Sequence, residues 1–186
     1  MKILNTSEFS EKFAIKPVDF TKFETDRVLG PTVNLGGKIW TARNLSVMPL
    51  DDDGRPLLKF NRDVFPGRND DSGMFYTYDA AKKCVPDGWR LPEKSDIQDL
   101  LKRYSANVSD WISKTDGGND TFGMNGILTG QYSTAARSVC NLPFIFCFWL
   151  RDENGKSVYF LANTRHRIIG FGPGGELALP IRLIKK

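Results

Sequence analysis

The chain has 186 residues and a formal net charge of +4, with 40% hydrophobic, 12% aromatic and 26% charged residues. This composition is typical of a globular domain and excludes a largely disordered chain, and the length is enough to bury a core without covalent cross-links. The basic excess is spread along the chain, and its longest clusters are Arg165–Arg167 and Lys185–Lys186. A dedicated nucleic-acid binder carries a denser basic stripe, so we expect no nucleic-acid partner.

The three cysteines are Cys84, Cys140 and Cys147, and none lies in a CxxC motif. An odd number at these spacings argues against a disulfide scaffold or a zinc site and favours buried free thiols. The first residues lack the apolar run of a signal peptide, and the apolar stretch Leu142–Leu150 is too short to span a membrane. We therefore expect assembly in a reducing cytoplasm and no membrane partner.

Residues 1–30 differ in character from the rest of the chain. Thr6 or Ser7 can cap a short helix, and Pro17 ends it. The extended arm that follows carries apolar residues between polar ones, and such a segment should not stay free in water. It either folds back on its own domain or docks on another subunit. We therefore divide the chain into an arm, residues 1–30, and a globular domain, residues 31–186.

The first half of the domain predicts a hairpin, a loop and two short helices. Paired glycines at Gly36–Gly37 accept positive φ and predict a hairpin within Val33–Trp40. Residues 49–72 are rich in Asp, Pro and Gly, and we expect a long polar loop there. Asp79–Cys84 predicts a short helix. A second helix follows Pro92 and presents one apolar stripe, formed by Ile97, Leu100, Leu101 and Tyr104.

The second half predicts antiparallel strands. Asn154–Gly155 is a strong turn signal between strands at 146–150 and 157–161. Residues 176–184 predict a closing strand in which Pro180 favours an edge or a bulge. The fold class expected from this order is α+β, with antiparallel sheets, two short helices and long loops. Three tryptophans are expected in the core, namely Trp40, Trp89 and Trp111.

Several blocks of the domain resemble one family in the order in which they occur. These blocks are Gly36–Leu45, Gly73–Ala81, Cys84–Pro92, Gly117–Asn125 and the pair Phe148–Trp149. Over about residues 33–184 they resemble the Fibrobacter succinogenes major paralogous domain. The resemblance implies a C-type-lectin-like fold and no established catalytic activity, and many members of this family look like secreted surface proteins.

The chain departs from that family at two points. It has no secretion signal, and Arg182 is followed by Leu183 where the family usually carries a cysteine able to pair with the earlier one. Cys84 therefore lacks the partner that the resemblance implies, which agrees with cytoplasmic assembly. Met1–Phe9, continuing to Ile15–Val18, resembles the start of many short proteins of crAss-like Bacteroides phages. This second resemblance implies a virion protein.

The sequence offers little for catalysis or metal binding. His166 is the only histidine and no GxSxG motif is present, so we expect no catalytic residue and no enzyme. Asp51–Asp53, Asp70–Asp71 and Asn119–Asp120 could supply oxygen ligands for calcium, or they could form solvated turns. We favour the turns and expect neither a metal nor a cofactor.

The late sheet carries the candidate ligand-binding residues, because polar and aromatic side chains near strand ends suit recognition of a sugar or a protein. These residues are Trp149, Arg151, Asn163, Arg165, His166 and Phe171. The same mixture also occurs on ordinary protein surfaces, and both interpretations stay open at this point.

Three functional hypotheses follow. The first is a non-enzymatic phage structural protein, such as a head decoration, head fibre or tail-associated protein, assembled in the host bacterial cytoplasm and located in the virion. Its arm would contact other virion proteins, its domain would face a host surface glycan or protein, and the chain would form a homo-oligomer. The second is a bacterial carbohydrate- or protein-binding module. The third, an enzyme of the formylglycine-generating branch of this fold, is disfavoured because that chemistry needs reactive cysteines.

Overall fold

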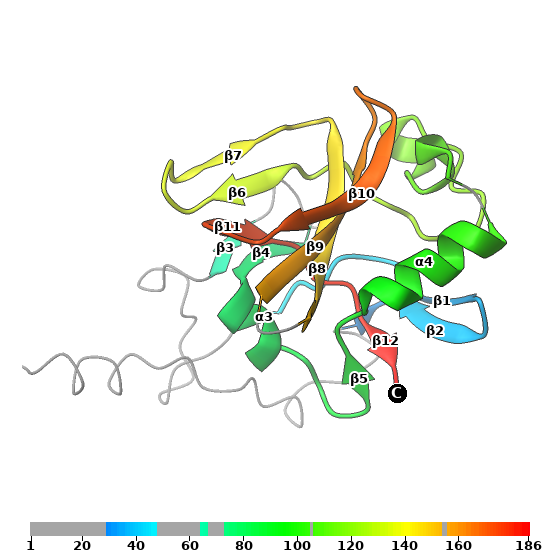
Figure 1. Cartoon of the computed structure of the whole chain (residues 1–186), viewed down its shortest axis with the longest axis horizontal. Coiled ribbons are helices and arrows are strands. Elements are labelled where there is room, and N and C mark those ends of the chain that lie inside the picture. Colours follow the sequence, from blue (N-terminus) through cyan, green and yellow to red (C-terminus); the bar gives the residue numbers. More distant parts are fainter. Residues whose placement is uncertain (1–28, 48–63, 67–72, 105, 154–155) are drawn as a thin grey trace, which may run out of the picture.

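The computed structural model describes residues 29–47, 64–66, 73–104, 106–153 and 156–186 (Figure 1). The predicted helix and most of the arm, together with the Asp-rich segments 51–53 and 70–71, lie outside these ranges. The described chain has a mixed α+β architecture in which three antiparallel sheets surround two cores. This confirms the expected fold class of antiparallel sheets with two short helices.

Two α-helices, two short 3₁₀ helices and twelve strands make up the described elements. The helices are α3 (Tyr78–Lys83), α4 (Lys94–Arg103), η4 (Val108–Asp110) and η5 (Lys114–Asp116). The four-stranded sheet has the order β1 (Thr32–Leu35), β2 (Lys38–Thr41), β12 (Ile184–Lys185) and β5 (Trp89–Arg90). The five-stranded sheet has the order β3 (Val64–Pro66), β4 (Met74–Thr77), β11 (Leu177–Leu179), β6 (Gln131–Ser133) and β7 (Ser138–Cys140). The three-stranded sheet has the order β10 (Ile168–Pro173), β9 (Lys156–Asn163) and β8 (Ile145–Glu153).

The hairpin predicted at Gly36–Gly37 is confirmed, and these residues turn β1 into β2 with φ values of 62° and 82°. The polar loop expected at 49–72 needs a correction, because Val64–Pro66 forms strand β3 and pairs with β4. Three residues are too few to show a strand pattern in the sequence. They form a strand because they pair with β4, which is a contact between segments of the folded chain.

Helix α4 begins where the sequence predicts and its stripe faces the interior through Ile97 and Leu100. Glu93 and Asp96 form a capping box, in which each side chain accepts a hydrogen bond from the other residue's backbone. Tyr104 was predicted to continue the buried stripe, but it is the C-cap and its side chain is 44% exposed. The i, i+3, i+4, i+7 spacing of the stripe does not extend to Tyr104, because the helix ends at Arg103.

The predicted closing strand is divided into two strands that belong to different sheets. Leu177–Leu179 forms β11 and Ile184–Lys185 forms β12, with Pro180 directly after β11. Between them the backbone bonds to the third sheet and to a loop, since Pro180 O accepts from Trp149 N–H of β8 and Ile181 O accepts from Leu45 N–H. This short segment therefore connects all three sheets.

Strand β8 separates the two cores, because alternate side chains of a strand point to opposite faces. Cys147 and Trp149 pack into the first core with α3, whereas Phe146 and Phe148 pack into the second core with α4. The second core is built from rings in tilted contact, with Phe148 5.0 Å from Phe160 and Trp111 5.2 Å from Phe160 between centroids. The tryptophans expected in the core, Trp40, Trp89 and Trp111, are all buried.

Candidate functional site

The candidate residues of the late sheet are divided between its two ends. Arg151 lies at the end where β8 turns into β9, and its guanidinium is 3.2 Å from the Glu93 carboxylate. Asn163 closes the other end, where it pairs with Ile145 and Ile168. Asn163 lies opposite Ile145, and six residue steps at about 3.3 Å each separate that end from Arg151 by roughly 20 Å.

Phe171 is half-buried partway along β10, with the Lys94 ammonium 5.2 Å from its ring centroid. In the strand register it lies opposite Phe160, which pairs with Phe148, midway between the two ends. Trp149 requires a correction, because it has no exposed surface and its Nε1 donates a 2.6 Å hydrogen bond to Tyr76 O. Its position in the strand sends its ring into the first core, so it cannot contact a ligand at the surface.

The turn between β9 and β10 brings together Asn163, Arg165 and His166. Asn163 Oδ1 accepts a 3.0 Å hydrogen bond from His166 N–H, which stabilises the turn. Thr164 then joins this turn to the preceding loop, because both its N–H and its hydroxyl donate to Phe144 O, at 2.9 and 3.2 Å. Two loops far apart in the sequence are thereby held side by side.

The joined loops, with β7 and β10 beside them, expose four apolar side chains that the sequence did not single out. Their exposed fractions are 41% for Val139, 38% for Leu142, 37% for Phe144 and 54% for Ile168. A Cβ built on Gly130 would lie 3.2 Å from Val139 and 3.1 Å from Leu142 N, so these two residues border the same glycine. We define the tip as these four residues with the basic residues of the turn, namely Arg165, His166 and Arg167.

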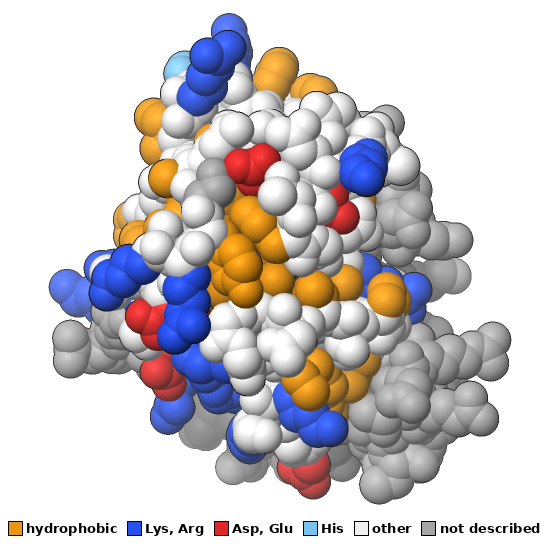
Figure 2. Space-filling view, turned by 90° about the vertical axis from the view of Figure 1, so that its right-hand side faces the viewer, with side chains coloured by type: hydrophobic (Ala, Val, Ile, Leu, Met, Phe, Trp, Pro, Cys, Tyr) orange, Lys and Arg blue, Asp and Glu red, His pale blue; other side chains and the backbone are white. Residues whose placement is uncertain are grey.

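Arg165 and Phe144 form the centre of the tip. The guanidinium carbon lies over the ring at 5.4 Å from its centroid, a cation–π arrangement. The segments 138–145 and 163–170 contain two arginines and a histidine and no carboxylate. Figure 2 shows basic and histidine side chains projecting at the top of the molecule, with hydrophobic side chains beside them. The tip therefore combines exposed apolar area with exposed basic side chains.

A second exposed aromatic surface lies where α4 ends. The Tyr104 ring is 5.2 Å from the Phe122 ring, and its hydroxyl accepts a 3.0 Å hydrogen bond from Gly36 N–H. Beside it, Asp110 accepts hydrogen bonds from the exposed side chains of Asn119 and Thr121. A hydrophobic patch edged by charged groups occupies the middle of this face of the molecule (Figure 2).

The Gly-rich loop uses its carboxylates to close turns. Asp116 Oδ2 accepts a 2.6 Å hydrogen bond from Leu128 N–H, and Asp120 Oδ1 accepts one of 2.6 Å from Asn125 N–H. Within the described ranges, no three acidic, histidine or cysteine side chains are placed to hold a metal ion. The turn interpretation of Asn119–Asp120 accounts for these contacts.

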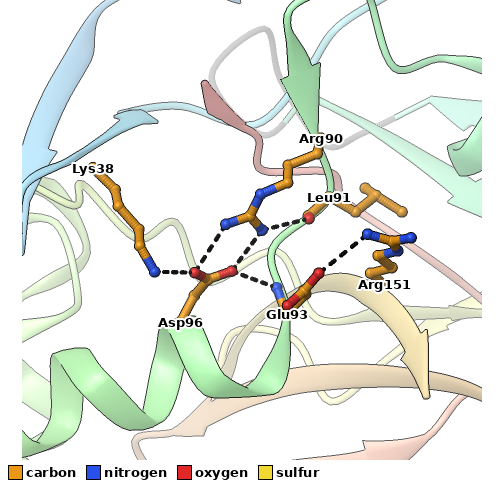
Figure 3. A network of polar contacts seen from close by, with 6 residues as sticks. All are labelled: Lys38, Arg90, Leu91, Glu93, Asp96 and Arg151. Atoms are coloured by element: carbon orange, nitrogen blue, oxygen red, sulfur yellow. Dashed lines mark hydrogen bonds and ion pairs between the residues drawn. The ribbon is translucent and has the colours of Figure 1, made fainter. Parts of the chain in front are cut away.

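A buried polar network fixes α4 to the first hairpin and to β5 (Figure 3). The Asp96 carboxylate accepts two hydrogen bonds from Arg90, at 2.7 and 3.0 Å, and one of 2.5 Å from Lys38. Burial by itself would raise the pKa of Asp96, but the hydrogen bonds and the nearby cations outweigh it and lower the pKa to about 2. The network is saturated by partners within the chain, so its role is structural.

The buried thiols are poorly suited to nucleophilic chemistry. Burial raises the pKa of Cys84 to about 12 and also raises the pKa of Cys147. A reactive cysteine needs the opposite shift, because the thiolate is the nucleophile. All three cysteines are unpaired, Cys140 being half-buried.

None of the helices in the described ranges is both long and apolar enough to cross a bilayer. Comparisons with protein-family models, with curated protein sequences and with solved structures find no match to this chain.

Proposed function

We propose that this protein is a non-enzymatic phage structural protein that displays a lectin-like binding domain, with the tip as its contact surface. The observation that carries the proposal is the tip itself, which has four exposed apolar side chains, one of which, Phe144, forms a cation–π pair with Arg165. Clustered exposed apolar side chains mark interaction surfaces, because burying them on a partner removes them from water. Aromatic residues and arginine are also the types most enriched among residues that dominate binding energy.

The construction of the tip supports a role in recognition. Thr164 fixes the Phe144 loop to the β9–β10 turn, and Asn163 fixes the turn itself. Side chains held in place before binding lose less conformational entropy on binding. The buried thiols with raised pKa values support the non-enzymatic part of the proposal.

The virion setting rests on the resemblance of the first residues to phage proteins and of the domain to a lectin-like family. In this proposal the arm, residues 1–30, contacts other virion proteins and the domain faces outward, with the head or the tail as its position. Mass spectrometry of purified phage particles tests this setting, and we expect the chain in a fixed ratio to the major capsid protein. Its absence from purified particles would remove the virion setting.

Binding of the full chain to Bacteroides cells and to purified particles tests the role of the tip. We expect saturable binding that falls at least tenfold in a variant combining Arg165→Glu with Ile168→Ser. Lys185→Glu is the matched control for charge, because it lies on β12 at the opposite side of the molecule (Figure 1). Equal binding by the wild type and the tip variant would contradict the proposed contact surface.

A second candidate is a carbohydrate-binding module that uses the aromatic surface at Tyr104 and Phe122. An exposed ring beside amide and hydroxyl groups suits stacking and hydrogen bonding to a sugar. A glycan array with and without calcium tests it, with Tyr104→Ala expected to abolish binding and Ile39→Ala to preserve it. An array without hits would exclude this candidate.

A further inference from the structure

We infer that the partner of the tip is an acidic protein surface that also presents apolar side chains, an inference that rests on the proposed function. The charge of the tip points to an acidic partner. Arg165, His166 and Arg167 are exposed, and the two segments that form the tip contain no acidic residue. A complementary carboxylate would therefore meet no like charge there, and opposite charges across an interface favour the correct partner.

The apolar side chains of the tip point to a protein. Val139, Leu142 and Ile168 are aliphatic, and a sugar ring gains little from aliphatic groups compared with a flat aromatic face. The tip has one aromatic ring, Phe144, and one of its faces is already occupied by the Arg165 guanidinium. Leucine, valine or phenylalanine side chains of a protein partner would instead bury the aliphatic groups directly.

The position of Arg165 makes it the specificity element. Its guanidinium carbon lies over the Phe144 ring at 5.4 Å from the centroid, and a planar guanidinium can bind a carboxylate with two parallel hydrogen bonds. A second copy of this chain meeting tip to tip would place arginines opposite arginines. Such pairing is repulsive, so the tip favours a different, acidic partner over self-association.

Selection from a random twelve-residue peptide library on the immobilised full chain tests the inference. We expect the selected peptides to combine Asp or Glu with Leu, Ile, Val or Phe. The same selection on Arg165→Glu should lose the preference for acidic residues or exchange it for Lys and Arg. Lys185→Glu, with the same change in net charge, should select the same peptides as the wild type.

Binding of a polyuronate and of a neutral glucan is measured for the same three proteins. These measurements distinguish a failure of this inference from a failure of the proposed function. One outcome is that the wild type binds polyuronate, Arg165→Glu does not, and no peptides are selected. This outcome would overturn the inference of a protein partner, but the tip would remain a binding surface. Selected peptides without acidic enrichment would overturn the charge argument alone. Binding of neither peptides nor polysaccharides would overturn both this inference and the tip as the contact surface.

Discussion

Arg182 Nε donates a 2.7 Å hydrogen bond to Asn44 Oδ1, joining two buried residues that are 138 positions apart in the chain. The other guanidinium nitrogens donate to three backbone carbonyls, those of Thr41, Met124 and Asn125, at 2.8 to 3.1 Å. Burial lowers the pKa of Arg182 to about 9, which leaves the group protonated at neutral pH. One side chain thus holds the closing segment, the first hairpin and the Gly-rich loop together.

Replacing this guanidinium is expected to destabilise the fold strongly. Arg182→Met keeps most of the volume but removes the hydrogen bonds that Arg182 donates to three backbone carbonyls and to the Asn44 amide oxygen, at a cost of about 3 kcal/mol or more. Urea denaturation monitored by tryptophan fluorescence measures the loss. Arg151→Met, which removes an exposed guanidinium, is the control and should change the free energy of unfolding by about 0.5 kcal/mol or less. Equal effects of the two variants would refute the bridging role of Arg182.

Removing the charge of Asp96 is expected to loosen α4. Asp96→Asn weakens the hydrogen bonds to Arg90 and Lys38 and should lower the free energy of unfolding by about 2–4 kcal/mol. Asp99→Asn changes an exposed carboxylate of the same helix and should have an effect near zero. Chemical denaturation of the three proteins at pH 7 compares them.

The stability contributed by Asp96 should depend on pH in acid. Its pKa is lowered in the folded state from 3.8 to about 2, so the folded protein binds this proton less readily than the unfolded chain. The resulting stabilisation, about 2 kcal/mol, is present in full well above pH 3.8 and is lost as the pH falls toward 2. The difference in unfolding free energy between wild type and Asp96→Asn should therefore shrink over this interval. A difference that stays constant down to pH 2 would contradict the shift.

Two glycines of β10 form a matched pair. A Cβ on Gly172 would lie 2.5 Å from the Tyr159 ring, whereas a Cβ on Gly170 would meet nothing within 4 Å. Gly172→Ala should therefore destabilise the protein by about 1–3 kcal/mol, because a buried ring has little room to move. Gly170→Ala should be neutral or slightly stabilising. Thermal unfolding followed by circular dichroism compares the two, and equal melting temperatures would refute the close approach.

The cysteines should react in a defined order. Cys84 and Cys147 are buried with raised pKa values, whereas Cys140 is half-buried. Iodoacetamide at pH 8 should therefore label Cys140 first in the folded protein, and the other two only after unfolding in urea. Intact-mass and peptide mass spectrometry count and locate the labels. Early labelling of Cys84 would show that its surroundings open readily.

The predictions that succeeded depended on neighbouring residues. Helix α4 follows from the spacing of Ile97 and Leu100, and the first hairpin follows from the freedom of Gly36–Gly37 to adopt positive φ. The predictions that were wrong depended on contacts between residues that are distant in the sequence. Pro180 divides the expected closing strand between two sheets, and β8 carries Trp149 inward because a core exists on both of its faces.

Some residues of the tip could be identified from the sequence, and others only from the tertiary structure. Asn163, Arg165 and His166 were identified from sequence because polar residues gather at a strand end, and the structure brings them together. Phe144 and Leu142 gave no signal, because the apolar stretch that contains them has the composition of a core strand. The pairing of Ile145 with Asn163 and the hydrogen bonds of Thr164 to Phe144 O place that loop beside the turn.

The sequence by itself determined the α+β class, the positions of α3, α4 and the first hairpin, and the burial of Trp40, Trp89 and Trp111. Composition, periodicity and turn chemistry act over a few residues, so they specify local elements. Tertiary structure alone decided the three-sheet arrangement, the bridge from Arg182 to Asn44 and the assembly of the tip. These features depend on contacts between residues that are far apart in the sequence. Such contacts form only when the whole domain packs together.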